Sequence, residues 1–202
     1  MSKIALLDAD CLHKFYLRGI LTWLASFRAY KPRWSEEILD ETIQSIVRRF
    51  PSEHPKLEVQ IKVMTARFPD AEIVGYQHLV GTLGCADPED EHVLAAAIVG
   101  KVDQLVTFNL KDFPKNTYAR FGIELIHPDD FLLEICLRDS DSFLSATAHW
   151  ISSYQRPSLD VTSLARIMTQ IGCARFADFM LAENSAIELM MATLGSADKP
   201  NP

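Results

Sequence analysis

Short apolar runs alternate with segments of helical pattern over the first 128 residues of the chain. Four runs have the length of a buried strand, namely "KIALL" (3–7), "EIVGY" (72–76), "DQLVTF" (103–108) and "IELIH" (123–127). Apolar residues at helical spacing mark the segments 12–29, 36–49, 55–67 and 87–100. Strands that alternate with helices in this way predict an α/β fold, in which helices cover both faces of a parallel sheet.

The helix predicted over 87–100 places one acid where core contacts belong. Asp87 can cap this helix, and Pro88 suits its first turn. At 100° per residue, Asp90 falls in the middle of the apolar face, and an ionised carboxylate is costly to bury without a partner. Two explanations stay open: a bound cation stabilises Asp90, or the backbone N–H groups and the dipole of the helix start do so.

The pattern changes after Pro128, where strand-like runs stop. Helices are predicted over 129–136, 139–154, 160–170 and 173–192. Pro157 separates two of them, and the last residues, "GSADKPNP" (195–202), are predicted to form a frayed tail. We therefore predict two domains, an α/β domain over 1–135 and a helical appendage over 136–202.

The composition fits a globular protein with one good core. The chain has 202 residues, of which 48% are hydrophobic, and this is enough for one domain with a small appendage. No apolar run reaches the roughly 18 residues of a membrane span, and "MSKIALLDAD" does not resemble a signal peptide. We therefore expect a cytoplasmic protein whose mature chain starts near Met1. Four cysteines lie too far apart for a zinc motif and are expected to be buried, reduced thiols: Cys11, Cys85, Cys136 and Cys173.

The net charge of −7 is unevenly distributed along the chain. Residues 1–70 carry a net charge of +2, whereas residues 71–202 carry a net charge of −9. A protein that binds a polyanion usually shows a surplus of basic residues, and this chain has such a surplus only in residues 1–70. On charge alone, the Lys and Arg residues of that segment are explained as parts of a solvated surface.

Acidic side chains follow two of the predicted strands. Asp8 and Asp10 come after the first strand, and Asn109 and Asp112 come after "DQLVTF". Ligands of an open parallel sheet bind outside the carboxyl ends of its strands. Crowded carboxylates either take up protons or bind a cation, and oxygen donors without Cys or His suit Mg²⁺ or Mn²⁺. Because Asp8 occupies a matching position, the cation explanation for Asp90 is favoured.

A helix that Ser35 can cap offers one further acid. Its apolar stripe consists of Leu39, Ile43, Ile46, Val47 and Phe50. Glu41 lies opposite this stripe, where it is either a solvated residue or a residue facing an open acidic cleft. Glu36, Glu37 and Asp40 compete for the same role, and the periodicity of the helix does not choose among them.

Four stretches of the chain together resemble PIN-domain ribonucleases, especially VapC-type toxins of bacterial toxin–antitoxin pairs. They are "ALLDADCL", "WSEEILDETIQSI", "DPEDEHVLAAAIVGKVDQLVTFNLKDFP" and "IELIHPDDFL", and they span most of residues 3–133. The third stretch is the most specific, because it joins an acid-rich helix start, an Ala-rich helix, "LVT" and "N-x-K-D-F" in one run. The resemblance implies a PIN-like fold, and the C-terminal helices resemble an extra domain found in a subset of these toxins.

The resemblance also implies an activity, a Mg²⁺- or Mn²⁺-dependent endoribonuclease. Asp8, Glu41 and Asp90 match the family's metal ligands, and Asp112 would support the site or bind a second ion. The metal in such a site lowers the pKa of a bound water and neutralises charge on the scissile phosphate. The family's partner is a small antitoxin, here expected to be VapB-like, whose tail blocks the cleft, and the toxins commonly form homodimers.

The chain departs from the family's pattern at two positions near this site. Asp10 stands where Asn is common in the first motif. The family often carries Asp two residues beyond a Thr, but here Asn109 follows Thr107 at that spacing and an acid returns only at Asp112. Either Asp112 fills the fourth acidic position, or Asn109 holds a metal-bound water. Thr107 either orients a carboxylate through its hydroxyl or is an ordinary strand residue.

An acidic pocket that receives phosphate groups needs a basic rim as well as a metal. The candidates for such an RNA-binding rim are Lys14, Arg18, Lys31 and Arg33. Each of them is individually explained as well by a surface charge. The RNA itself and its cleavage site have no signature in the sequence.

Two rival functions fit part of the same pattern. A PIN fold that has lost acids can serve as a non-catalytic binding protein, and Asn109 keeps this alternative open. A phosphatase of the haloacid-dehalogenase type uses a similar order of residues, which Asp8, Asp10, Thr107, Lys115, Asp129 and Asp130 imitate. Only about twenty residues separate Thr107 from the acid pair, too few for the usual intervening strand–helix unit.

Overall fold

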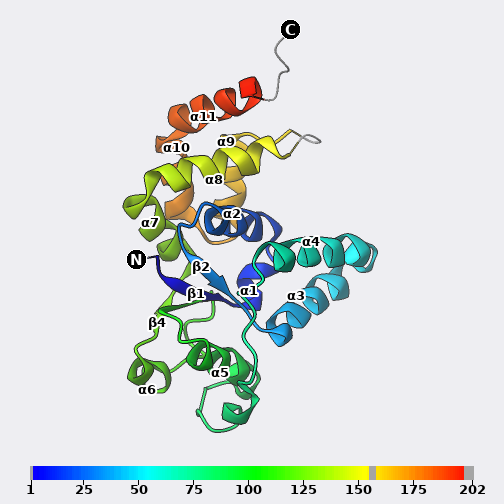
Figure 1. The fold of residues 1–202 in the computed structure, drawn as a ribbon, viewed down its shortest axis with the longest axis vertical. Coiled ribbons are helices and arrows are strands. Elements are labelled where there is room, and N and C mark those ends of the chain that lie inside the picture. Colours follow the sequence, from blue (N-terminus) through cyan, green and yellow to red (C-terminus); the bar gives the residue numbers. More distant parts are fainter. Residues whose placement is uncertain (1, 155–157, 198–202) are drawn as a thin grey trace. The chain divides into compact units, whose positions relative to one another are not determined.

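A computed structural model describes residues 2–154 and 158–197, and its sheet has four parallel strands (Figure 1). The strands are β1 (Ile4–Leu7), β2 (Lys31–Arg33), β3 (Gln104–Val106) and β4 (Glu124–Ile126). Their order across the sheet is β2-β1-β3-β4, and every neighbouring pair is parallel. The predicted α/β class with a parallel sheet is therefore confirmed.

The two central strands explain why their sequences are apolar throughout. In β1, Ala5 and Leu6 are fully buried, as are Leu105 and Val106 in β3. A parallel strand with neighbours on both edges and helices on its faces has no side that meets water, so polar residues do not alternate with apolar ones.

The edge strand β2 is a strand that the sequence pattern did not predict. Its residues "KPR" looked like a break between helices because proline lacks the N–H that a central strand donates. Pro32 pairs with Ala5 in the parallel register, and β2 has only β1 as a neighbour. An edge position tolerates proline, because one row of N–H groups needs no strand partner there.

The strand predicted for "EIVGY" (72–76) is wrong. This segment makes one isolated parallel bridge, between Trp34 and Glu72, instead of a continuous ladder. Gly75 then turns the chain away with a φ of +79°. Ala71, Ile73 and Tyr76 are nevertheless buried, so the apolar alternation records packing rather than strand pairing.

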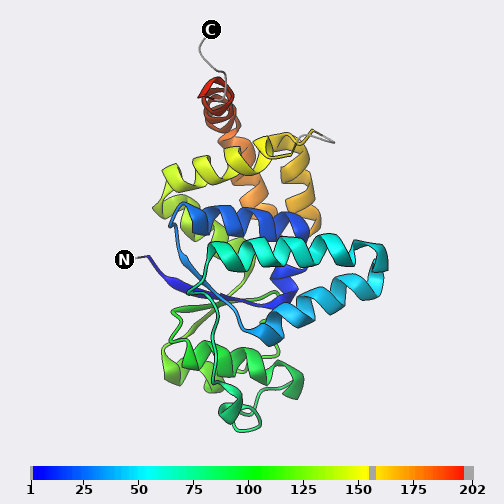
Figure 2. The same cartoon turned by 45° about the vertical axis from the view of Figure 1, so that its right-hand side comes forward.

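Five α-helices accompany the sheet in the described part of residues 1–14 and 30–128. They are α1 (Ala9–Leu12), α3 (Glu36–Arg49), α4 (His54–Arg67), α5 (Glu91–Val99) and α6 (Lys115–Tyr118). Short 3-10 turns occupy Pro51–Glu53, Gln77–Leu79, Pro88–Asp90 and Ala119–Phe121. The predicted cap of α3 is confirmed, since Ser35 Oγ accepts the Ile38 N–H at 3.2 Å. Figures 1 and 2 both show α3 and α4 side by side as a helical hairpin.

The helix predicted over 87–100 begins later than expected. Asp87 accepts the Glu89 N–H at 2.9 Å and caps a 3-10 turn, so that α5 starts only at Glu91. All seven residues from Glu91 to Ala97 are buried. A helix buried on every side has no polar face, and Asp90 lies at its start rather than inside an amphipathic pattern.

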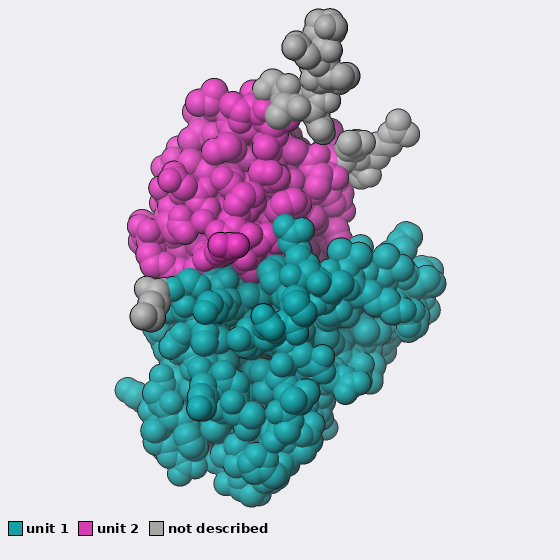
Figure 3. All heavy atoms as spheres, viewed as in Figure 1, with its two compact units in different colours: residues 1–14, 30–128 teal, residues 15–29, 129–202 magenta. Residues whose placement is uncertain are grey.

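The chain divides into two compact units, coloured in Figure 3, that differ from the predicted domains 1–135 and 136–202. The first unit comprises residues 1–14 and 30–128, and the second comprises 15–29 and 129–202. The difference arises because α2 (Phe15–Ser26) packs on C-terminal helices. Ring contacts at 5.5 Å and 5.2 Å join Phe15 to Trp150 and Trp23 to His149. Composition along the chain carries no signal of such long-range packing.

The second unit is built mainly from helices in its described residues, and helices were predicted for its part after Pro128. Besides α2 it contains α7 (Pro128–Arg138), α8 (Ser140–Ser152), α9 (Val161–Gln170), α10 (Ala174–Ala182) and α11 (Asn184–Ala197). The single helix predicted over 173–192 is two helices, which meet at Glu183. The predicted break at Pro157 and the end of the predicted tail, 198–202, lie outside the described residues.

Gly19 allows α2 to approach α8 closely. A Cβ at this position would overlap the indole ring of Trp150. We expect Gly19→Ala to lower the free energy of unfolding by about 1–3 kcal/mol, because inserted atoms force a packed interior to shift. Urea denaturation measures the change. Adding Trp150→Leu should recover part of the loss, and a strictly additive double variant would contradict the overlap.

Two further sequence expectations can be compared with the structure. No helix in the described ranges is both long and apolar enough to cross a membrane. All four cysteines are free thiols, of which Cys11, Cys136 and Cys173 are buried and Cys85 is half-buried. The expectation of buried, unpaired cysteines therefore holds for three of them.

Candidate active site

Asp8 is held at the carboxyl end of the central strand β1. Its backbone N–H donates to the Val106 carbonyl at 3.1 Å, which continues the β1–β3 ladder by one residue. Its side chain caps α1 by accepting the Ala9 N–H at 2.6 Å. Only 6% of the residue is exposed. The fold thus fixes this carboxylate between the ends of two strands, with little access to water.

Asp10 and Thr107 are in direct contact. The Thr107 hydroxyl and the Phe108 N–H donate to Asp10 Oδ2 at 2.9 Å and 2.8 Å. Thr107 is fully buried, and its hydroxyl also accepts the Asn109 N–H at 3.0 Å. The other oxygen, Asp10 Oδ1, is buried without a hydrogen-bond partner among the described residues. A buried carboxylate oxygen without a partner is costly, and a cation would satisfy it.

The pKa of Asp8 shows that negative charge is crowded around this strand end. This pKa is raised from 3.8 to about 7, mainly by burial and next by the charge of Asp10. Hydrogen bonds from Thr107 and Ala9 act in the opposite direction, and the charge of Asp90 adds a smaller upward effect. The fold therefore brings Asp8, Asp10 and Asp90 close enough to repel one another.

Asp90 lies near the same carboxylates and is also affected by three further acids. Its carboxyl is half-buried, and burial is the main reason that its pKa rises to about 6. Among neighbouring charges, the largest effects on the pKa of Asp90 come from Asp112 and Asp87, which raise it, and from His92, which lowers it. Glu41 adds a further upward effect. All four predicted acids, Asp8, Glu41, Asp90 and Asp112, thus belong to one electrostatic group.

The loop after β3 favours Asp112 over Asn109 for the fourth acidic position. Asn109 is exposed, and its carbonyl accepts the Asp112 N–H at 3.2 Å. The Asp112 carbonyl in turn accepts the Ala86 N–H at 3.1 Å, which ties this loop to the segment before Asp90. Asp112 is also the charge with the largest effect on the Asp90 carboxyl.

Glu41 has a partner that sequence reasoning missed. His92, which is buried on α5, places Nε2 3.0 Å from Glu41 Oε1 and Nδ1 3.6 Å from Glu37 Oε2. Burial lowers the pKa of His92, but the two glutamates outweigh it, so the net shift is upward. These are ion-pair distances without good hydrogen-bond alignment. The sequence favours a surface or core role for His92 over a ligand role, because a single histidine on an apolar helix is usually a core residue.

Glu91 is the second missed residue, and it supports the loop before the site. This buried carboxylate accepts backbone N–H groups from Leu83 at 2.8 Å, from Gly84 at 2.5 Å and from Gly81. Burial alone would raise the pKa of Glu91, but hydrogen bonds from Gly84, Gly81 and Leu83 together lower it. The residue next to Asp90 therefore anchors the loop rather than lining the site.

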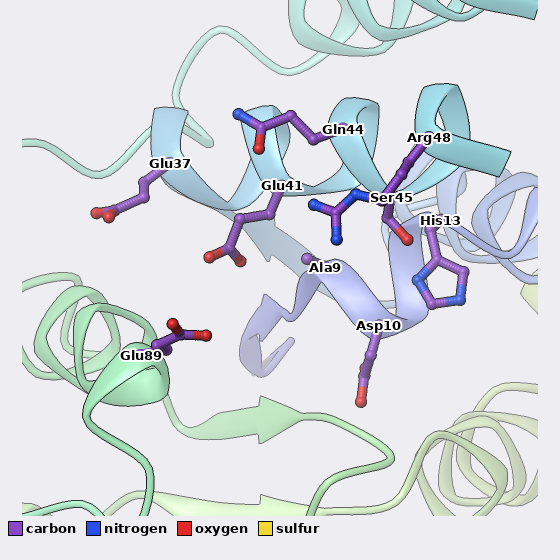
Figure 4. A pocket seen from close by; sticks show the side chains of 9 residues that line it. All are labelled: Ala9, Asp10, His13, Glu37, Glu41, Gln44, Ser45, Arg48 and Glu89. Carbon is purple, nitrogen blue, oxygen red and sulfur yellow. The ribbon is translucent and has the colours of Figure 1, made fainter. Parts of the chain in front are cut away.

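A cavity of about 620 Å³ opens beside these acids (Figure 4). The lining residues come from α1 and its C-terminal end, from α3 and from the turn before α5: Ala9, Asp10, His13, Glu37, Glu41, Gln44, Ser45, Arg48 and Glu89. Two predicted site residues, Asp10 and Glu41, thus share one cavity. Arg48, His13 and Gln44 had not been singled out from the sequence as site residues.

The predicted basic rim is only partly assembled here. Lys14 donates to the Asp10 carbonyl at 3.1 Å and lies over the Phe108 ring at 4.3 Å. Arg33 donates to the Pro32 carbonyl at 2.9 Å. Lys31 pairs in register with Ile4, at the amino end of the sheet and away from the carboxylates.

Arg18 belongs to the second unit and not to the unit that carries the acids. Its guanidinium lies 5.6 Å from the Phe15 ring centroid, and burial lowers the pKa of Arg18 to about 10. Only 6% of the residue is exposed. Its predicted role at the rim stays a prediction.

The oxygen donors of these residues suit a hard divalent cation, although in this structure they are not arranged as a complete set of metal ligands. Within residues 2–154 and 158–197, no group of three His, Cys, Asp or Glu side chains is arranged to hold a metal ion. Burial is the main reason that the pKa values of Asp8 and Asp90 are raised, and repulsion from neighbouring carboxylates adds to it. Carboxylate oxygens are the ligands that Mg²⁺ and Mn²⁺ prefer. The free Asp10 Oδ1 is one donor already in place.

Comparison with known proteins places the chain in a family. The model of the PIN domain family matches residues 6–111, about half of the chain, and the chain therefore belongs to the PIN domain family. The resemblance drawn from the sequence motifs is thus confirmed. A 60-residue segment is 42% identical to a protein named "Putative ribonuclease VapC50" from Mycobacterium tuberculosis (strain ATCC 25618 / H37Rv). The match spans 30% of this chain and about a third (35%) of that relative, and no solved structure matches the chain.

Proposed function

We propose that this protein is a divalent-metal-dependent endoribonuclease and the toxin of a type II toxin–antitoxin pair. The observation that carries the proposal is the group of uncompensated carboxylates at the carboxyl edge of the sheet. Asp8 and Asp90 both have pKa values raised toward neutrality, and Asp10 keeps a buried oxygen free. Such strongly perturbed acids beside a cavity are typical of functional sites. Membership of the PIN family and the similarity to VapC50 support the assignment.

Asp8, Glu41 and Asp90 would hold a Mg²⁺ or Mn²⁺ ion, and Asp112 would support them or bind a second ion. When bound, the metal supplies an activated water and neutralises charge on the scissile phosphate. The chain's own residues contribute positioning. Thr107 fixes Asp10 through one hydrogen bond, and His92 restrains the flexible Glu41 side chain through an ion pair.

The partners follow from the same proposal. The substrate is RNA, the regulator is a small VapB-like antitoxin whose tail enters the cleft, and the active form in the cytoplasm is a homodimer. An acidic cavity of this size suits the insertion of a basic side chain from such a tail.

The phosphatase alternative finds little support in the second unit. Asp129 accepts the N–H groups of Phe176 at 2.8 Å and Arg175 at 3.2 Å, and it therefore caps α10. Asp130 forms an ion pair with Arg175. Both members of the acid pair thus have structural roles within the helical unit.

Cleavage of a structured RNA in Mn²⁺ tests the proposed function. We expect wild-type protein to cut the RNA, EDTA to stop the reaction, and Glu41→Gln to slow it about 100-fold, because a carboxylate ligand to the metal is lost. Glu36→Gln is the matched control, since Glu36 is exposed on the same helix and lies outside the cavity. RNA binding without any cleavage would favour the non-catalytic alternative, and equal rates for the two variants would remove Glu41 from the site.

A further inference from the structure

One face of α3 forms a wall of the cavity, and its charge changes along the helix. Glu37, Glu41, Ser45 and Arg48 follow one another at intervals of four, four and three residues, which places them on the same side. Figure 4 shows Glu41 and Arg48 projecting toward the segment that carries Ala9 and Asp10. The wall is acidic near the start of α3 and basic near its end.

Arg48 is the cation of this wall, and it has no carboxylate partner among the described residues. Among the described residues that line the cavity, it is the only Arg or Lys. Four carboxylates share the same cavity, those of Asp10, Glu37, Glu41 and Glu89. No ion pair or hydrogen bond joins the Arg48 guanidinium to any side chain in the described part of the protein. A guanidinium that stays unpaired in an acidic cavity keeps its donors available for another anion.

Lys14, one of the four basic candidates drawn from the sequence, already makes contacts of its own. Lys14 donates to the Asp10 carbonyl at 3.1 Å, lies 3.2 Å from His13 Nε2 and sits over the Phe108 ring. Its ammonium therefore supports the α1 end of the cavity. A substrate phosphate would have to displace these contacts to reach Lys14, whereas within the described residues no ion pair or hydrogen bond to a side chain holds the Arg48 guanidinium.

We propose that Arg48 binds a phosphate of the RNA substrate in this cavity, which deepens the nuclease function proposed above and rests on it. The planar guanidinium matches two phosphate oxygens at once, a geometry that a lysine cannot reproduce. Arg48 is seven positions after Glu41, about 10 Å along the helix. The backbone of a bound single strand would then run along α3, with Glu41 at the metal and Arg48 on a neighbouring phosphate.

Binding of a labelled single-stranded RNA of mixed sequence, measured by fluorescence anisotropy in EDTA, tests this assignment without cleavage. We expect Arg48→Gln to raise Kd about 5- to 10-fold, since a charge-assisted contact is lost. The slope of log Kd against log salt should shrink by about 0.7, the value for one phosphate contact to a single strand. Arg48→Lys should keep the slope but bind more weakly than wild type.

Arg49→Gln is the matched control, because it removes the same charge from the next residue. Arg49 is exposed, stacks on Phe50 at 5.5 Å and does not line the cavity, so its Kd should change less than twofold. In Mn²⁺, Arg48→Gln should raise KM for RNA cleavage by a similar factor and leave kcat within about threefold.

Equal weakening by the two variants, or unchanged RNA binding by Arg48→Gln, would overturn the assignment. If wild-type protein bound RNA but never cut it, the proposal of nuclease activity would be rejected. The comparison of Arg48 with Arg49 would still decide whether the cavity holds a phosphate.

Discussion

Asp8→Asn is expected to stabilise the metal-free protein at pH 8 by about 2–4 kcal/mol while reducing RNA cleavage about 1000-fold. The pKa of Asp8 is about 7 in the folded protein and near 3.8 in the unfolded chain. Between these values the folded state keeps a proton that the unfolded state releases, so wild-type stability falls as the pH rises through this range. Asparagine carries no charge and can still accept the Ala9 N–H. The variant therefore avoids the cost of ionising a buried carboxyl in the folded state.

Urea denaturation in EDTA at pH 8 and pH 5 measures the effect. The gain in free energy of unfolding of Asp8→Asn over wild type should shrink by more than half at pH 5, because most wild-type Asp8 is already protonated in the folded state at this pH. Mn²⁺ should stabilise wild type and leave Asp8→Asn unchanged, because a ligand that binds only the folded state adds to its stability. Asp40→Asn, at an exposed position on α3, is the control for both stability and cleavage. A variant that is less stable than wild type at both pH values would show that Asp8 is only a helix cap.

The central part of the fold could be predicted because its residues carry their own signal. Strands β1, β3 and β4 are short apolar runs. They pair in parallel, as the sequence predicted. The edge strand β2 contains Pro32, and "EIVGY" alternates like a strand but makes a single bridge. In both cases the neighbouring segment, and not the local sequence, decides whether a strand forms.

The candidate acids could be singled out from the sequence for the same reason. Asp8 follows a buried strand, and Asp90 sits before an apolar helix, so each position is unusual on its own. His92 and Glu91 look like ordinary members of α5, and only the folded chain shows their partners. Arg48 is one of several exposed arginines until the cavity is known. The local sequence pattern therefore identifies the acids at unusual positions, and only the tertiary structure identifies the residues that support them.

Replacing Glu91 should give the largest loss of stability. Its carboxylate accepts three backbone N–H groups from the loop over 81–84, and two of the donors are glycines with positive φ. We expect Glu91→Ala to lower the free energy of unfolding by about 3–5 kcal/mol, because three buried donors lose their acceptor. Glu91→Gln should cost about 2–3 kcal/mol, since its amide offers one acceptor oxygen and sets a donor against the remaining N–H groups.

The pH dependence separates the anchoring carboxylate from simple packing. The pKa of Glu91 is lowered in the folded protein, so its contribution is complete above pH 4.5 and is lost as the pH falls below that value. The difference between wild type and Glu91→Gln in urea denaturation should therefore narrow between pH 5 and pH 3. Glu72→Gln, at an exposed position, should show no difference at any pH. A constant difference across this range would mean that Glu91 stabilises the loop through its shape, and its charge would then have no part in holding Asp90 at the site.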